Sequence, residues 1–171
     1  MESLTKNKQS RETIRKIADK YFPYDPLKDY EELTEGYFNV AYEVALESGR
    51  RVILKVAPPE GVPVMSYEKN IMFAEVEAMK MAAADPLIPV PEIYGYDDSR
   101  SICSSFYFFM EKRRGNSLYS QSQKLPEETV HALMRETGAI NRRINEITCS
   151  RFGLPGQTEA RGMRGIPFLK G

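Results

Sequence analysis

The sequence Val52-Ile53-Leu54-Lys55-Val56-Ala57 predicts a short apolar strand with one lysine in its middle. Side chains alternate between the two faces of a strand, so the valines and Leu54 share one face and Lys55 lies on the other beside Ile53. An ammonium group flanked by apolar side chains either leaves over an edge of the sheet or meets an anion. The chemistry available on this face of the sheet therefore depends on whether an anion lies beside Lys55.

A helix predicted over residues 67–84 offers a candidate anion, Glu75, twenty residues further along the chain. With about 100° of rotation per residue, several apolar side chains fall within about 60° of Glu75. They are Ile71, Met72, Ala78, Met79 and Ala82. A carboxylate in an apolar face loses on the order of several kcal/mol of hydration unless a cation stands opposite, and Lys55 is the candidate cation. The alternative is an edge-strand lysine and an exposed glutamate that never meet.

The composition is that of an ordinary globular protein with one core. The chain has 171 residues, 42% of them hydrophobic, and its 24 basic residues equal its 24 acidic ones. No overall charge favours nucleic acid or an anionic membrane. The basic groups Lys112-Arg113-Arg114 and Arg142-Arg143 are short and balanced by acids, which indicates a solvated face and no nucleic-acid site.

The compartment is predicted from segments that the chain lacks. The longest apolar runs, such as residues 106–110, are too short to span a bilayer, and the polar residues 1–11 contain no signal-peptide core. Cys103 and Cys149 have no metal-like spacing and are expected to be reduced thiols. We expect a soluble, cytoplasmic chain with no membrane or nucleic-acid partner.

Periodicity predicts a helix, a hairpin, a helix, two strands and a long helix, in that order. Ser10 caps a first helix over about residues 10–22. The strand Val40 to Leu46 returns through the Ser48-Gly49 turn to pair antiparallel with the Lys55 strand. A short strand follows near residues 92–95. The next strand, residues 105–111, is apolar on both faces and is expected inside the sheet.

The long helix begins at Pro126 and runs to about Thr148 with a continuous apolar stripe. The stripe consists of Val130, Leu133, Met134, Thr137, Ile140, Ile144 and Ile147. Gly138 interrupts this helix, and we expect it to mark the close approach of another helix. The alternative is a mild flaw that costs about 1 kcal/mol against alanine. The glycine-rich residues 157–171 have no period and are expected to form an irregular tail.

Several local sequences together carry a family resemblance. They are Leu33 to Val44 with its Gly36 and Asn39, Ile53-Leu54-Lys55, Glu75 within residues 74–79, Pro89-Val90-Pro91-Glu92-Ile93-Tyr94, residues 106–111 with Arg114-Gly115 after them, and Arg151-Phe152-Gly153. In this order and at these distances, they resemble the amino-terminal lobe of the aminoglycoside phosphotransferase and choline kinase family, which has a protein-kinase-like fold.

The resemblance implies an α+β fold class. Residues 1–111 would form a nucleotide-binding lobe, an antiparallel sheet of about five strands with one helix. Residues 112–156 would form the hinge and the first helix of a truncated helical lobe. The nucleotide implied is ATP, with Lys55 on its α- and β-phosphates and Glu75 as the ion-pair partner of that lysine.

The resemblance also implies the remaining nucleotide contacts. Gly36 and Asn39 belong to the loop that covers the nucleotide, and the turn near Gly36 would meet phosphate through backbone amides. Ile53 would pack on the face of the adenine. The main-chain groups around Glu111 and Lys112 would hold the edge of the base.

The chain departs from the family pattern in ways that bear on catalysis. Gly36 stands alone where ordinary protein kinases have a full glycine motif, and Asn145 stands where histidine is common. No aspartate follows Asp98, and the single histidine, His131, is expected to be an ordinary surface residue. The catalytic aspartate and the magnesium ligands of the family are therefore expected to be missing, so no catalytic or metal-binding residue is predicted here.

Three hypotheses follow. The first is the ATP-binding lobe of a small-molecule phosphotransferase, truncated before the catalytic loop, whose magnesium and substrate belong to the full-length protein. The second is a non-catalytic half-kinase that binds nucleotide or docks to a partner, with self-association through the exposed helix over residues 130–147. The third is an unrelated α+β domain in which Lys55 and Glu75 are structural.

Overall fold

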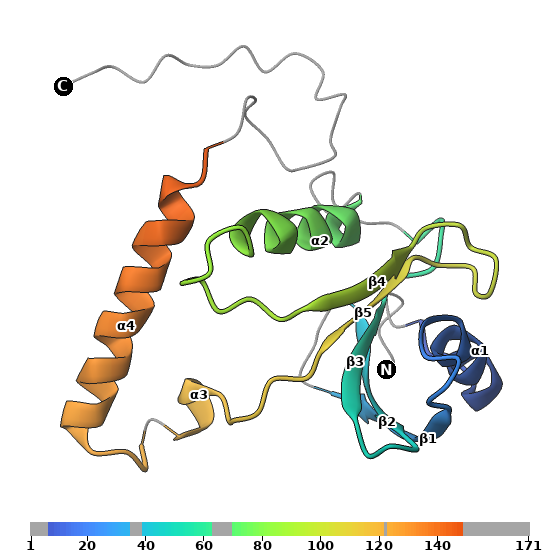
Figure 1. The fold of residues 1–171 in the computed structure, drawn as a ribbon, viewed down its shortest axis with the longest axis horizontal. Helices are drawn as coiled ribbons and strands as arrows, with labels where there is room; N and C mark the ends of the chain where they lie inside the picture. The colour runs from blue at the N-terminus through green and yellow to red at the C-terminus, as the bar shows by residue number, and fades with distance from the viewer. Residues whose placement is uncertain (1–6, 35–38, 63–69, 122, 149–171) are drawn as a thin grey trace.

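The computed structural model describes residues 7–34, 39–62, 70–121 and 123–148, and it contains one five-stranded antiparallel sheet (Figure 1). The strands are β1 (Leu27–Leu33), β2 (Val40–Leu46), β3 (Arg51–Val56), β4 (Ile93–Asp97) and β5 (Tyr107–Glu111), in the spatial order β1-β2-β3-β5-β4. The helices are α1 (Arg11–Tyr21), α2 (Ile71–Ala82), α3 (Leu118–Gln121) and α4 (Glu127–Glu146). The α+β class and the antiparallel sheet are confirmed.

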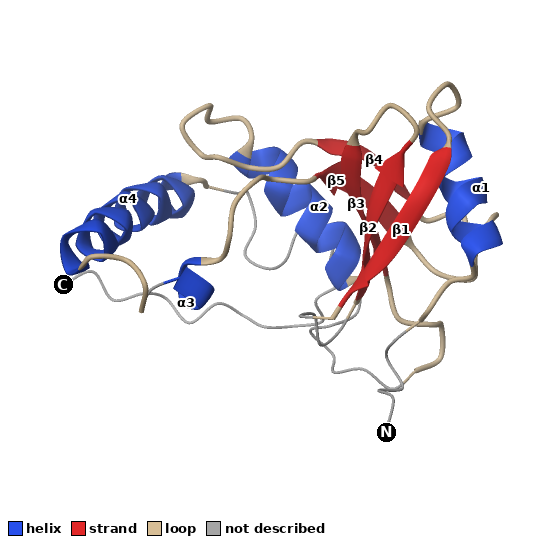
Figure 2. Cartoon of the chain, turned by 90° about the horizontal axis from the view of Figure 1, so that it is seen from below, coloured by secondary structure: helices blue, strands red, loops and turns tan. Residues whose placement is uncertain are grey.

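The two faces of the sheet are covered by different helices, as Figure 2 shows for α1 and α2. On one face, Leu54 of β3 packs in a core with Ile14 and Ile17 of α1. On the other face, Phe108 of β5 packs with Met72 and Val76 of α2. The alternation of apolar side chains in β3 therefore serves two separate layers, and Lys55 belongs to the α2 layer because it lies directly opposite Phe108.

Polar contacts cap α1 and join it to the sheet. Ser10 caps α1 as predicted, because its side chain accepts a hydrogen bond from the Thr13 backbone at 3.1 Å. The buried carboxylate of Asp97 in β4 forms an ion pair with Lys20 of α1 and accepts a hydrogen bond from the Tyr107 hydroxyl at 2.8 Å. These contacts join α1, β4 and β5.

The strands differ from the prediction mainly at the sheet edges. β5 lies inside the sheet between β3 and β4, as predicted, although it begins at Tyr107. β4 runs two residues further than expected, to Asp97. The pattern of its own residues did not reveal β1, because only Leu27 is buried in a strand with four charged side chains. As an edge strand it needs little apolar surface.

The orientation of α2 differs in part from the predicted stripe. Met72 is buried as expected, but the other buried residues are Ala74 and Val76, and Ala78 is exposed. The helix begins after Asn70, which has a positive φ of 57°. Because apolar side chains surround this helix on nearly all sides, its sequence alone leaves the buried face undetermined.

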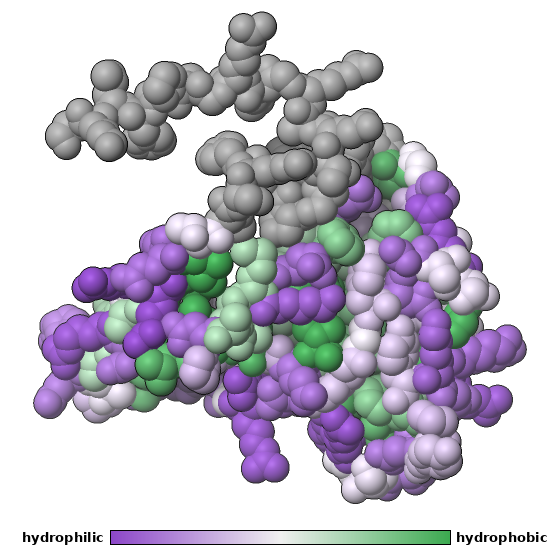
Figure 3. All heavy atoms as spheres, turned by 45° about the horizontal axis from the view of Figure 1, so that its top comes forward, coloured by the Kyte–Doolittle hydropathy of each residue, from purple (hydrophilic) through white to green (hydrophobic). Residues whose placement is uncertain are grey.

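The long helix α4 lies apart from the sheet (Figure 1), and none of its residues is buried. Leu133, Met134 and Ile144 are exposed, and Figure 3 shows apolar patches among polar ones on the side of the molecule where α4 lies. Arg143 ties α4 to Asp85, in the loop after α2, at 2.8 Å. Within the described ranges, no helix has the length and apolar character needed to cross a membrane.

The prediction for Gly138 is wrong in the part of the chain that the structure describes. A Cβ atom added at Gly138 would meet no atom within 4 Å, so no helix packs closely there. The short helix α3 was not predicted, because four residues are too few to show a period. His131 is exposed, as expected. The predicted irregular tail, residues 157–171, lies outside the described residues.

Candidate functional site

Lys55 and Glu75 form the predicted ion pair. The Lys55 Nζ atom lies 2.5 Å from Glu75 Oε1, and the two side chains are 24% and 31% exposed. β3 is an inner strand, so Lys55 has no sheet edge over which to escape. The alternative of an edge lysine and a distant glutamate is therefore wrong.

Packing of α2 on β5 brings the two side chains together. Phe108 is fully buried between the sheet and the apolar side chains of Met72 and Val76. The Lys55 ammonium lies 5.7 Å from the centre of the Phe108 ring. An ammonium group has three donors, and Glu75 takes one of them. Because the pair is partly exposed, an anion from solvent can reach the lysine.

Ile53 lies two residues before Lys55 in β3, so the two side chains share one face of the strand. Ile53 lies opposite Glu43 of β2 and Met110 of β5, and it is only 8% exposed. It therefore offers little free surface to the face of a base. Asn39 directly precedes β2, and its buried Oδ1 atom has no hydrogen-bond partner in the described structure. Gly36 lies outside the described residues.

Glu111 and Lys112, which follow each other at the end of β5, are held in different directions. The Glu111 backbone N–H donates to Glu92 at 2.8 Å, and its carboxylate contacts Arg113 at 3.3 Å. Lys112 instead forms an ion pair with Glu43 of β2, on the sheet face that carries Lys55. The structure thus brings the Lys112 side chain towards the Lys55 face. The Glu111 amide is already used by the carbonyl of Glu92, which directly precedes β4.

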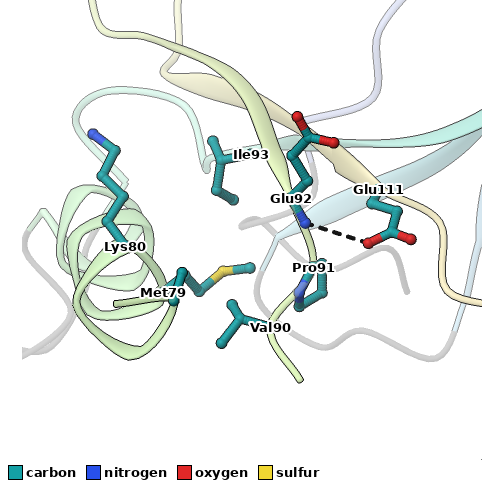
Figure 4. A pocket seen from close by; sticks show the side chains of 8 residues that line it. Met79, Lys80, Val90, Pro91, Glu92, Ile93 and Glu111 are labelled. Carbon is teal, nitrogen blue, oxygen red and sulfur yellow. Dashed lines mark hydrogen bonds between the residues drawn. The ribbon is translucent and has the colours of Figure 1, made fainter. Parts of the chain in front are cut away.

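The Glu111 side chain lines a pocket of about 380 Å³ at the end of α2. Met79, Val90 and Ile93 surround the pocket, while the ammonium of Lys80 points away from it (Figure 4). Neither Lys55 nor Glu75 lines this pocket. It is therefore separate from the ion pair.

Glu43 is a charged residue of this face that the sequence prediction missed. It is 8% exposed, and it is held by Arg51 of β3 as well as by Lys112. The hydrogen bond from Lys112 lowers the pKa of Glu43 below its usual range, against the effect of burial, with further help from Arg51. The signal was present: Glu43 alternates with the apolar face of β2, and the Ser48-Gly49 turn sets it opposite Ile53.

The described residues bring no three His, Cys, Asp or Glu side chains together as metal ligands. The chemistry of this face is that of two lysine–carboxylate pairs, Lys55 with Glu75 and Lys112 with Glu43. Of the two carboxylates, Glu75 is the more exposed.

An antiparallel five-stranded sheet whose third strand holds a lysine against a glutamate of the next helix is the arrangement found in protein-kinase-like nucleotide-binding lobes. The chain belongs to the phosphotransferase enzyme family, whose model matches residues 29–165. This match confirms the family resemblance that the local sequences carry.

The curated relatives are fungal and much longer. Subtelomeric hrmA-associated cluster proteins from two strains of Aspergillus fumigatus are each 28% identical to the chain over 130 residues. The match covers 75% of this chain and 25% of each relative. The chain thus spans about a quarter of the length of these relatives.

Two solved structures overlap part of the chain. One, from Thermobifida fusca, is described as a fructosamine-3-kinase and is 18% identical, with a TM-score of 0.44 over 60% of this chain and 33% of that one. The other, from Ralstonia eutropha, is described as an aminoglycoside phosphotransferase and is 20% identical, with a TM-score of 0.49 over 69% of this chain and 31% of that one.

Proposed function

We propose that the chain forms the ATP-binding lobe of a small-molecule phosphotransferase, which transfers a phosphoryl group from ATP to a substrate hydroxyl. The observation that carries the proposal is the contact between Lys55 and Glu75, a partly exposed ion pair on an inner strand. Membership of the phosphotransferase enzyme family supports it. The family uses this class of chemistry in general.

In this proposal, Lys55 donates to non-reacting phosphate oxygens, and Glu75 holds its ammonium in place. ATP, when bound, supplies the phosphoryl group. Ile53 contributes the small surface it has free, and the main chain at Lys112 faces the edge of the base. Asn39, which directly precedes β2, would meet the phosphates together with Gly36. The unpartnered Asn39 Oδ1 fits a site that is completed by further hydrogen bonding.

The sequence has no aspartate after Asp98, so the transfer step itself is not assigned to residues of this chain. What the described residues do is bind and orient the nucleotide. Charge from Lys55 offsets the negative charge of the phosphates, and the helix that carries Glu75 fixes where that charge lies. The small-molecule substrate belongs to the activity of the whole protein.

Calorimetric titration with a non-hydrolysable ATP analogue tests the proposal. Lys55→Met should weaken binding at least about tenfold, because it removes a charged hydrogen-bond donor to phosphate. Lys16→Met is the matched control, since Lys16 pairs with Glu12 on α1 at the opposite face of the sheet. Equal binding by Lys55→Met and the wild type, or no binding by a folded wild type, would contradict the proposal and favour the unrelated-domain hypothesis.

A second candidate function is a non-catalytic half-kinase that docks to a partner or to a second copy. The exposed Leu133, Met134 and Ile144 on α4 favour it. Sedimentation should then show association that Met134→Glu reduces. A monomer at all concentrations would count against this candidate and leave the ATP-binding proposal untouched.

A further inference from the structure

Glu43 links three strands through its buried carboxylate. It lies in the middle of β2, and its side chain is only 10% exposed. Its Oε1 atom pairs with Arg51 at the start of β3, and its Oε2 atom pairs with Lys112 immediately after β5. The Arg51 and Lys112 side chains are both more exposed than the Glu43 carboxylate. The buried carboxylate of Glu43 therefore holds the two cations in position.

Lys112 opens the segment that leaves the sheet after β5, and its neighbour is held as well. Arg113 contacts the Glu111 carboxylate at 3.3 Å and donates to the backbone carbonyl of Val90 at 3.1 Å. Lys112 is thus drawn towards β2 and Arg113 towards the approach to β4. Two consecutive side chains hold this short backbone segment from both sides.

The energetics make the Glu43 contact a strong constraint. Moving Lys112 away would leave a carboxylate that is nine-tenths buried with Arg51 alone, and a buried carboxylate that loses a partner is costly. The same contact holds the pKa of Glu43 below its usual range, so the carboxylate is charged at neutral pH. The backbone at Lys112 is therefore preorganised by a residue on β2.

We propose that Glu43 is a positioning residue for the base end of the nucleotide site, acting through Lys112 on the backbone that meets the edge of the base. This inference rests on the proposed function and deepens it. Glu43 does not touch the phosphates, which belong to Lys55. Replacing Glu43 should therefore weaken the binding of the base and leave the binding of the phosphates unchanged.

Two probes separate the base from the phosphates: a non-hydrolysable ATP analogue and inorganic tripolyphosphate. The measured quantity is the ratio of their dissociation constants, which gives the preference for a ligand with a base. Because both probes carry similar charge, the ratio largely removes the general effect of altering a charge on the protein. Glu43→Gln should lower this preference at least about fivefold, while Lys55→Met weakens both probes together.

Lys112→Met breaks the same contact from its more exposed end, and it should lower the preference similarly. It carries the test if thermal unfolding shows that Glu43→Gln is not folded. Glu47→Gln, an exposed carboxylate just after β2, is the matched control and should leave the preference unchanged.

The outcomes are distinguishable. A preference unchanged in Glu43→Gln and Lys112→Met, or lowered in Glu43→Gln alone, overturns the role of Glu43 and leaves the ATP site standing. Equal binding of the two probes by the wild type overturns it too, because no base is then recognised. If the wild type binds neither probe, the proposed function fails and this inference fails with it.

Discussion

Two carboxylates on the α2 side of the sheet are each neutralised by a lysine from another element, yet their burial differs. Glu43 is nearly enclosed, so moving its partner Lys112 away would cost free energy because a buried carboxylate would lose a partner. Glu75 and Lys55 keep 31% and 24% of their side-chain surface exposed. An exposed pair costs little to rearrange, so Lys55 can share its charge with an arriving phosphate while Glu43 stays fixed.

A third carboxylate, Asp97, is buried on the α1 side of the sheet, where it contacts Lys20 and Tyr107, and gives a prediction on stability. Burial alone would raise its pKa, but hydrogen bonds from Lys20, Ser99 and Tyr107 together hold the pKa of Asp97 well below its usual range. Asp97→Asn removes the charge that these donors surround. We expect the free energy of unfolding to fall by about 2 kcal/mol at neutral pH, as measured by urea denaturation.

The same group gives a pH dependence with a definite sign. Since the pKa of Asp97 is lower in the folded protein than in the unfolded chain, its contribution is fully present above about pH 4, the ordinary range of an aspartate. It is lost as the pH falls through the lowered folded value. Unfolding free energies should therefore decline less steeply below pH 4 in Asp97→Asn than in the wild type. Parallel curves would show that Asp97 is not the group responsible.

The sequence predicts those helices and strands in which apolar residues recur at the period of the element, because one face is buried. The apolar residues of β2 alternate along the chain, and the turn after β2 fixes its pairing with β3. The alternating residues, all buried, are Val40, Tyr42, Val44 and Leu46. β1 has no such pattern, because an edge strand with one buried leucine is stabilised by backbone pairing to β2. Periodicity therefore finds inner strands more readily than edges.

The residues of the candidate site also differ in how far the sequence predicts them. Lys55 and Glu75 could be predicted because each is a charge within an apolar pattern, which demands a partner. Glu43 follows the same rule, but its partner Lys112 is distant in sequence, so only the pairing of β3 with β5 shows where it lies. The implied roles of Glu111 and Lys112 come from the family resemblance alone.

The observed orientation of α2 gives a test that separates structure from sequence pattern. Ala74 is 4% exposed, whereas Ala78, which the predicted stripe placed inside, is exposed. Ala74→Glu should therefore lower the free energy of unfolding by about 3 kcal/mol or more, because it buries an unpaired carboxylate. Ala78→Glu should change it by no more than about 0.5 kcal/mol. The reverse ranking in thermal or urea unfolding would restore the sequence-based orientation.

In the whole molecule, the two faces of the sheet have different roles. Its α1 side is a closed hydrophobic core with Ile14, Ile17 and Leu54 fully buried. Its α2 side carries the charged residues Glu43, Lys55 and Lys112. α4 stands outside both layers and touches the sheet domain through the Arg143–Asp85 pair. Ligand binding on the α2 side should therefore leave the α1 side undisturbed.

The most direct test is an NMR titration of the backbone amides with a non-hydrolysable ATP analogue. We predict shifts at Lys55, Glu75 and Lys112 and at the facing residues of β2, with the amides of α1 unchanged. Lys55→Met should abolish the shifts near Glu75 without altering the spectrum of the free protein elsewhere. Shifts confined to α1 or to the pocket beside Met79 and Ile93, with the amide shift of Lys55 unchanged, would contradict a nucleotide site at Lys55.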